Sequence, residues 1–327
     1  MSESIRVIQY GLGAIGQAAA QVVRTKPGME LVAIIDPALT GSEVCGLPVQ
    51  ESLPDLNADA VIHCTGSSFA VVYEQLAEIV SAGLSCVTSC EEMLFPRYRN
   101  PELAEELNNL CVSNSVGVLG TGVNPGFVMD TLPVLLTAVS QSVRSIRVLR
   151  VVDAGTRREA LQRKVGAGLT REEFQKLADE GNIRHVGLPE SLAFLADALG
   201  RPYGDIQETL EPVLRSDGRV AGVKQVATIE GLTLELQMYV GAPNPRDEIH
   251  IDGNPDLHAF IQGGTPGDVA TPAILVNMLP RLLEAGPGFP SRNSPRCLAC
   301  QCARFKVCHL RTHVISSGWY RGLNARR

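Results

Sequence analysis

Residues 5–16, "IRVIQYGLGAIG", join an apolar strand pattern directly to glycines at positions 11, 13 and 16. A helical pattern follows, and a second apolar segment, "LVAIIDP", ends at Asp36. In a dinucleotide-binding unit the first glycine makes a tight turn, the second lets the backbone approach a pyrophosphate, and the third lets helix and strand pack closely. The phosphates then lie at the positive end of the helix dipole. We therefore predict a Rossmann fold whose cofactor loop comprises Gly11, Leu12, Gly13, Ala14, Ile15 and Gly16.

Asp36 follows the glycines by about twenty residues, at the end of the second predicted strand. A carboxylate in that position accepts hydrogen bonds from the adenosine ribose hydroxyls and repels a 2′-phosphate. The next three residues, "PAL", supply no cation that would offset the repulsion. NAD is thus the predicted cofactor, and NADP stays possible if a cation approaches from elsewhere in the fold.

Strand and helix patterns continue to alternate after Asp36, with strands expected at 59–68 and 84–90. Such alternation predicts a parallel sheet covered by helices on both faces. Ligands of these sheets bind outside the carboxyl ends of the strands. We therefore expect two segments to face the cofactor, Thr65-Gly66-Ser67 and the turn Cys90-Glu91-Glu92.

The pattern changes after residue 135. A long strand is expected at 145–155, a polar helical region follows, and two alternating segments joined around Gly231 predict a hairpin, with further strands at 247–253 and 257–264. The predicted fold class is α/β, with an N-terminal doubly wound parallel sheet and a second α/β domain built on an open mixed sheet. The expected domains are 1–135 for the Rossmann fold and 136–267 for substrate binding and dimerisation. Residues 268–289 should form a helix that packs back on the first domain.

Residues 290–327 differ from the rest in charge, cysteine density and aromatic content. Four cysteines lie in "CLACQCARFKVCH", a spacing that could hold zinc. The simultaneous shift in all three properties instead indicates an atypical tail, disordered or not native to the fold, and no metal site is predicted. The other five cysteines lie in apolar contexts, where a reduced thiol packs as a small hydrophobic group.

Composition limits the classes of partner. The apolar fraction of 45% can fill a sizeable core, and the formal charge of −6 argues against nucleic acid as a main partner. No apolar segment reaches the roughly 18 residues that a membrane helix needs, and the N-terminus lacks a signal-peptide pattern. A cytoplasmic protein without a membrane partner is therefore expected.

The motifs together resemble the 2,4-diaminopentanoate dehydrogenases and related amine dehydrogenases, within the dihydrodipicolinate reductase-like superfamily. The similar stretches are "GLGAIG", "VTSCEEMLFP", "GTGVNPGFVMD", "RVVDAGTRREALQRKVGAG" and "GGTPGDVATPAILVNMLPRLLEAGPG", within residues 5–289. The resemblance implies a homodimer that uses NAD(P) to interconvert an amine with a small aldehyde or ketone and ammonia.

Dihydrodipicolinate reductases differ from this chain at the catalytic positions. Their His-His pair is replaced by Ala160 and Leu161 before Lys164, and their Pro-Ser-Gly-Thr loop by "GAGLT". Their Gly-Thr-Thr-Gly turn under the nicotinamide is Ser89-Cys90-Glu91-Glu92 here. Negative charge beside a nicotinamide is costly to desolvate unless the charge has a task.

Glu91 and Glu92 are therefore the candidate acid–base residues, because a positioned carboxylate can move protons and stabilise a cationic iminium. Sequence does not decide between them, and an acid that complements a helix N-terminus explains one of the two. Asn124 of "GVNPGF" is a further candidate through the resemblance, although Asn-Pro-Gly is also a common turn.

Polar residues at 157, 158, 162 and 164 are expected to line the cleft, and His250 and His258 are interpreted as structural. Two alternatives remain open: an imine reductase of the dihydrodipicolinate type, and a sensor that binds NAD without catalysis.

Overall fold

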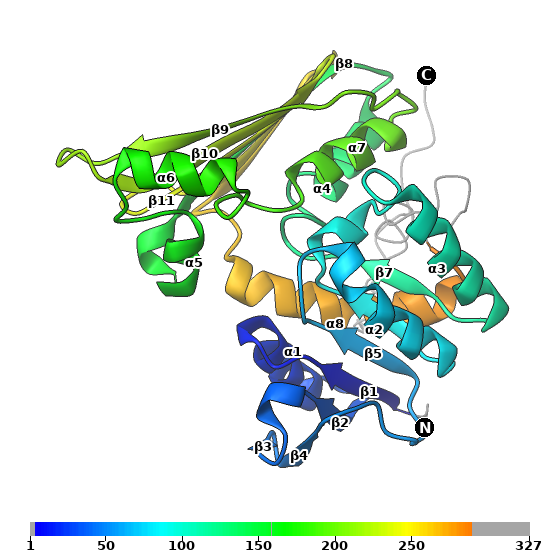
Figure 1. Cartoon of the computed structure of the whole chain (residues 1–327). Helices are drawn as coiled ribbons and strands as arrows, with labels where there is room; N and C mark the ends of the chain where they lie inside the picture. Colours follow the sequence, from blue (N-terminus) through cyan, green and yellow to red (C-terminus); the bar gives the residue numbers. More distant parts are fainter. Residues whose placement is uncertain (1–3, 158, 290–327) are drawn as a thin grey trace, which may run out of the picture.

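The computed structural model describes residues 4–157 and 159–289, which form two sheets with helices packed against them (Figure 1). The first sheet has seven strands in the order β3-β4-β2-β1-β5-β6-β7. Its strands are β1 (Ile5–Tyr10), β2 (Met29–Ile35), β3 (Glu43–Val44), β4 (Leu47–Gln50), β5 (Ala60–His63), β6 (Ser85–Thr88) and β7 (Val118–Gly120). All neighbouring pairs are parallel except β3 and β4, as the alternation of strands and helices predicted.

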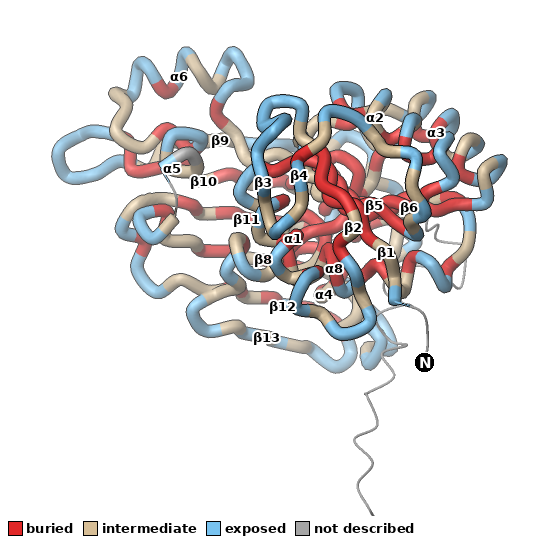
Figure 2. The backbone as a smooth tube through the Cα atoms, turned by 90° about the horizontal axis from the view of Figure 1, so that it is seen from below, coloured by how far each residue is buried: buried red, intermediate tan, exposed pale blue. Residues whose placement is uncertain are grey.

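Helices cover both faces of this sheet, so its central strands are buried throughout (Figure 2). One face packs against α2 (Phe69–Ser81) and α3 (Pro101–Ser113). The other packs against α1 (Ala14–Thr25) and α8 (Gly267–Ala285), whose leucines fill the same core as the α1 alanines. The chain thus returns to the first sheet after it has built the second.

The second sheet has six strands in the order β13-β12-β8-β11-β10-β9. They are β8 (Ser142–Asp153), β9 (Gln207–Leu214), β10 (Val220–Ile229), β11 (Leu232–Tyr239), β12 (Arg246–Asn254) and β13 (Leu257–Gln262). The predicted hairpin around Gly231 is confirmed, and the sheet is mixed because β8 and β11 run parallel. Strand β9 was not predicted, since it is a largely exposed edge strand that contains Pro212.

Four helices accompany the second sheet: α4 (Thr131–Leu136), α5 (Glu159–Lys164), α6 (Arg171–Asp179) and α7 (Leu188–Ala198). Short 3₁₀ helices complete the fold: η1 (Pro37–Leu39), η2 (Glu91–Leu94), η3 (Thr137–Val139) and η4 (Ala154–Thr156). Helix α7 is buried along most of its length against β10 and β11, and Phe174 of α6 fills a smaller core beside it.

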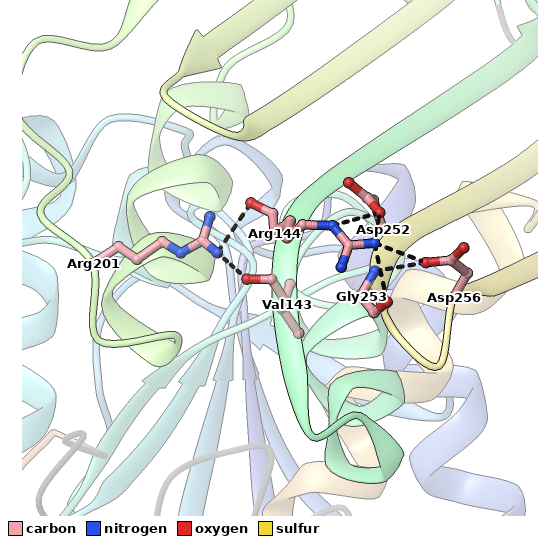
Figure 3. Close-up of polar contacts among 6 residues, drawn as sticks. All are labelled: Val143, Arg144, Arg201, Asp252, Gly253 and Asp256. Carbon is pink, nitrogen blue, oxygen red and sulfur yellow. Dashed lines mark hydrogen bonds and ion pairs between the residues drawn. The ribbon is translucent and has the colours of Figure 1, made fainter.

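An arginine network ties β8 to the turn between β12 and β13 (Figure 3). The Arg144 guanidinium donates to Asp252 Oδ1 at 3.0 Å and to the Gly253 carbonyl at 3.1 Å. Asp256 Oδ1 accepts the Gly253 N–H at 2.9 Å, which closes the turn. On the opposite side, Arg201 donates to the carbonyls of Val143 and Arg144. This end of the sheet is therefore held by side chains from three separate segments.

The described cysteines are all free, as their apolar contexts predicted. The cysteine-rich segment around residues 297–309 lies outside the described residues. Within the described part, no helix combines the length and the hydropathy that crossing a bilayer would require.

Candidate active site

A cavity of about 370 Å³ lies between the carboxyl ends of the first sheet's strands and the helix-bearing face of the second sheet. The first sheet contributes the glycine loop and the segments that follow β5 and β6. The second contributes Arg150 and Val152 of β8 and Met238 of β11. The loop after β7, helix α5, the loop before α7 and the start of α8 complete the lining, so the cavity joins segments that are far apart in the chain.

The glycine loop presents an uncapped helix N-terminus to this cavity. Gly13 is the N-cap of α1, with no side-chain cap and no acid in the first turn, and Gly13, Ala14 and Ile15 line the cavity. A Cβ added to Gly13 would meet nothing within 4 Å, whereas one on Gly16 would lie 2.0 Å from the Gly11 carbonyl oxygen. Gly11 itself has φ +90° and contacts the Cys64 carbonyl. Two glycines are thus required by packing, and the third faces open space suited to an anionic ligand.

Asp36 lies at the end of β2, directly beside the glycine loop. Its Oδ2 accepts the Leu12 N–H at 2.8 Å and its Oδ1 accepts the Ala38 N–H at 3.0 Å. Each oxygen has a further lone pair, so the carboxylate is held in place and can still accept from a ligand hydroxyl.

The segment after β5 places Thr65, Gly66 and Ser67 on the cavity wall. Behind them, the buried His63 hydrogen-bonds to Thr65 Oγ1 at 2.8 Å and to Thr88 Oγ1 at 2.9 Å. Burial lowers the pKa of His63 to about 4, so the ring is neutral near pH 7. This imidazole links the ends of β5 and β6 under the cavity.

The side chains of the two adjacent glutamates, Glu91 and Glu92, lie in different environments. The two residues open η2, and Glu91 lines the cavity together with Ser67. Glu92 is 5% exposed and turns toward α2, where its Oε2 accepts the Phe69 N–H at 2.8 Å and the Ser68 hydroxyl at 3.1 Å. Neither Glu92 nor Cys90 is part of the cavity lining, although the whole turn was expected to face the cofactor.

Burial raises the pKa of Glu91 above its ordinary value, while the Lys164 ammonium and the nearby Ser67 hydroxyl oppose that rise. The carboxylate is also held sterically. Gly187, at φ +103°, lies so close that a Cβ there would be 3.2 Å from Glu91 Cβ and 2.5 Å from Pro125 Cγ. The start of α7 therefore braces both Glu91 and the loop that carries Asn124.

Asn124 lines the cavity with both amide atoms buried and without a hydrogen-bond partner among the described residues. The His185 ring lies beside the Asn124 backbone, and its Nδ1 is likewise unpartnered within the described chain. Burial lowers the pKa of His185 to about 3. Buried polar groups normally have partners, so these atoms mark where a polar ligand would fit.

Four cationic side chains line the cavity: Arg150, Arg157, Lys164 and Arg184. Arg150 is paired with the buried Asp247 at 2.7 Å, and Arg157 with Asp268 at 2.9 Å. Within the described residues, Lys164 and Arg184 have no ion-pair partner. Gln162, expected in the cleft, instead donates to the Arg157 carbonyl at 2.9 Å, and residue 158 lies outside the described part.

The model for the 2,4-diaminopentanoate dehydrogenase C-terminal domain matches residues 127–301. The 2,4-diaminopentanoate dehydrogenase of Acetoanaerobium sticklandii is 30% identical over an alignment of 323 positions that covers 88% of this chain and 92% of that protein. The chain belongs to the 2,4-diaminopentanoate dehydrogenase family. The predicted family and the predicted oxidoreductase class are both confirmed.

Solved structures of low identity share the family's fold. Amine dehydrogenase from Mycobacterium smegmatis superposes with a TM-score of 0.75 at 24% identity, covering 88% of this chain and 95% of that one. Scyllo-inositol dehydrogenase from Lactobacillus casei, solved with NAD(H) and scyllo-inositol, gives a TM-score of 0.55 at 14% identity over 85% and 89% of the two chains. The predicted α/β fold class is therefore confirmed.

Some site residues of this family member carried no signal in the sequence. His185 lies in a polar segment with no motif, and it reaches the cavity only because Gln225 holds its backbone N–H and carbonyl at 3.0 and 3.1 Å. Arg150 lies in the strand expected at 145–155, and nothing in the sequence of that strand indicates a functional role. Gly267, Asp268 and Thr271 enter the site because α8 begins at the cavity.

Proposed function

We propose that this protein is an NAD(P)-dependent amine dehydrogenase that oxidises a small amine or amino acid to an iminium, which water converts to a carbonyl compound and ammonia. The reverse direction is the reductive amination of a small aldehyde or ketone. The observation that carries the proposal is the position of Glu91: one carboxylate, separated from its neighbour, lies on the wall between an uncapped helix N-terminus and unpartnered polar groups. The relatives' names point the same way.

Glu91 is assigned the acid–base role. Its raised pKa brings a carboxyl closer to the working pH, where it can take a proton from the substrate ammonium and return one to the departing oxygen in the opposite direction. Once that proton has passed on to solvent, the carboxylate is negatively charged again and stabilises the iminium cation that forms when the hydride leaves. Glu92 is assigned a structural role, because its carboxylate already serves the N-terminus of α2.

The glycine loop fits a nicotinamide dinucleotide, since free N–H groups and open space at Gly13 meet the needs of a pyrophosphate. When bound, the nicotinamide accepts or supplies the hydride. Asp36 favours NAD, because both its oxygens lie beside the loop and no ion pair to it occurs among the described residues. Asn124 supplies an amide whose donor and acceptor can hold a carboxamide or the substrate.

Lys164 and Arg184 support a substrate that carries an anionic group, such as the carboxylate of an amino acid. The other two cavity cations are already paired with Asp247 and Asp268, whereas these two have no ion-pair partner within the described chain. Guanidinium and ammonium groups are the usual ligands of carboxylates.

The decisive experiment compares Glu91→Gln with Glu92→Gln. NADH oxidation is measured with ammonia and a panel of aldehydes, ketones and keto acids. Loss of a general acid–base group lowers kcat by roughly 10²–10⁴-fold, so Glu91→Gln should do so while Glu92→Gln keeps turnover near the parent level. Equal losses in both variants, or rates that do not depend on ammonia, would overturn the assignment. An ammonia-independent rate would favour the imine reductase, and NADH binding without any turnover would favour the sensor.

A homodimer is part of the proposal through the family resemblance. Light scattering on the purified chain measures it directly, and a mass equal to one chain at micromolar concentration would contradict it.

A further inference from the structure

Three side chains with metal-binding atoms converge on the face of the second sheet opposite α7. Glu248 and His250 lie two residues apart on β12 and therefore point to the same face, and His258 of β13 is directly paired with His250 across the strands. The histidines are about half exposed, at 48% and 52%, and Glu248 is 19% exposed. None of the three residues lines the cavity, and the cluster has no part in the proposed catalysis.

We propose that Glu248, His250 and His258 form a binding site for a divalent transition metal, with Zn²⁺ as its best-matched ion. Glu248 Oε1 lies 2.7 Å from His250 Nε2 and 3.3 Å from His258 Nε2, and the ligand atoms all lie within 4.8 Å of one another. Ligands at about 2.0–2.1 Å from a tetrahedral zinc are about 3.4 Å apart. Of the three separations, the one between Glu248 and His258 already matches, and the one between Glu248 and His250 needs to widen by less than about 1 Å. The third, between the two imidazole nitrogens, is at most 4.8 Å.

The imidazole rings are arranged to direct both nitrogens to one point. They stack with centroids 4.0 Å apart and an interplanar angle of 17°, so both Nε2 atoms approach the same carboxylate oxygen. Two histidines and a carboxylate are a common zinc ligand set, with water in the fourth position. Hydroxyl or carbonyl oxygens alone would suit magnesium or calcium, but two imidazoles favour a softer ion.

The two arginines beside the proposed site are already paired with carboxylates, so the local charge permits a bound cation. Glu248 Oε2 is held by Arg246 Nε at 3.0 Å, which leaves Oε1 for the metal. Arg147, beside His250 on β8, is paired with Glu235 at 3.0 Å. Glu248 Oε1 is therefore the carboxylate oxygen that faces both imidazoles.

The hairpin that carries the site is already rigid. Asp256 closes its turn and Arg144 anchors it to β8 (Figure 3), so a metal would bind ligands that are largely in place. Beyond β13, the Thr265 backbone is held by Arg150 and Asp247 at 2.6 and 2.7 Å before the chain enters α8 at the cavity. A metal would therefore cross-link the edge strand β13 to β12, just before the chain reaches the active site.

Zinc binding to the full chain tests the proposal. The parent protein, treated with chelator and then titrated with Zn²⁺ at pH 8, should take up one equivalent that His250→Gln and His258→Gln both lose or weaken by more than about tenfold. Phe260→Leu is the matched control, because Phe260 lies two residues from His258 on the same face, is similarly exposed, and is paired with Glu248, so an apolar replacement alters this strand without adding a polar atom beside the ligand. That variant should bind as the parent does. Zinc should also raise the melting temperature of the parent and the control only.

The cysteines near the C-terminus are a possible second source of zinc binding, and Co²⁺ separates the two. Cobalt in the proposed site has nitrogen and oxygen ligands, so its spectrum lacks the intense thiolate charge-transfer band. If the histidine variants bind as much zinc as the parent, or the parent binds none up to millimolar concentration, the site does not exist. A cobalt spectrum with only thiolate-type bands would lead to the same conclusion.

Discussion

Two glycines of the cofactor loop allow the effect of a substitution on folding to be measured separately from its effect on cofactor binding. Gly16 is tightly packed, whereas Gly13 faces open space. An alanine Cβ at Gly16 would lie 2.0 Å from the Gly11 carbonyl oxygen and 2.9 Å from Gln9 Nε2, and ordinary contact begins at 3.4 Å. The first neighbour is backbone, so helix α1 or the loop has to move by the difference, about 1.4 Å. The same change at Gly13 meets nothing within 4 Å, and its φ of −58° suits alanine.

Gly16→Ala should therefore destabilise the fold by about 1–3 kcal/mol, the usual cost of overpacking a tight contact. Gly13→Ala should leave the free energy of unfolding within about 1 kcal/mol of the parent, since only an N-cap preference changes. Its methyl group nevertheless occupies the space through which a pyrophosphate would approach the α1 N–H groups. We expect the Kd for NADH to rise by at least about tenfold, which corresponds to about 1.4 kcal/mol.

Urea unfolding followed by circular dichroism gives the stability of each variant, and NADH fluorescence gives the Kd. An unchanged Kd for Gly13→Ala would refute the placement of the pyrophosphate over this residue. Parent-like stability for Gly16→Ala would refute the close contact between α1 and the loop.

Three further predictions follow from titratable and charged groups. Because burial raises the pKa of Glu91, kcat/KM for amine oxidation should fall as the pH drops through that raised value, and a pH–rate profile of Glu91→Gln should lack this limb. The pKa of His63 is about 4 in the folded protein against 6.5 in the unfolded chain, so the unfolded chain binds a proton first as the pH falls. The contribution of the neutral ring to the free energy of unfolding is therefore complete above pH 6.5 and should decrease by up to about 3 kcal/mol toward pH 4. Urea denaturation at several pH values should show a weaker pH dependence of stability for His63→Gln than for the parent. Asp247→Asn leaves the Arg150 guanidinium buried without its anion and should cost about 3–5 kcal/mol in urea unfolding, whereas a cost below 1 kcal/mol would mean that water reaches Arg150.

The sequence predicted those parts of the fold that depend on residues close together in the chain. The glycine spacing, the apolar strands and Gly231 identify a βαβ unit and a hairpin because each depends on residues close together in the chain. The sequence pattern did not predict strand β9, because its residues are mostly exposed and include Pro212, so they do not alternate between apolar and polar. The parallel pairing of β8 with β11 also has no local signal, since about eighty residues separate the two strands.

The sequence by itself placed Glu91 and Glu92 at a strand end and identified a pair of acids that needed a purpose. It could not divide their roles, because that depends on the direction in which η2 leaves β6 and on the position of the α2 N-terminus. The tertiary structure divides the roles: Glu92 accepts a hydrogen bond from the Phe69 N–H, and Glu91 lines the cavity. His185 and Arg150 join Glu91 through contacts between distant segments, which no spacing along the chain records.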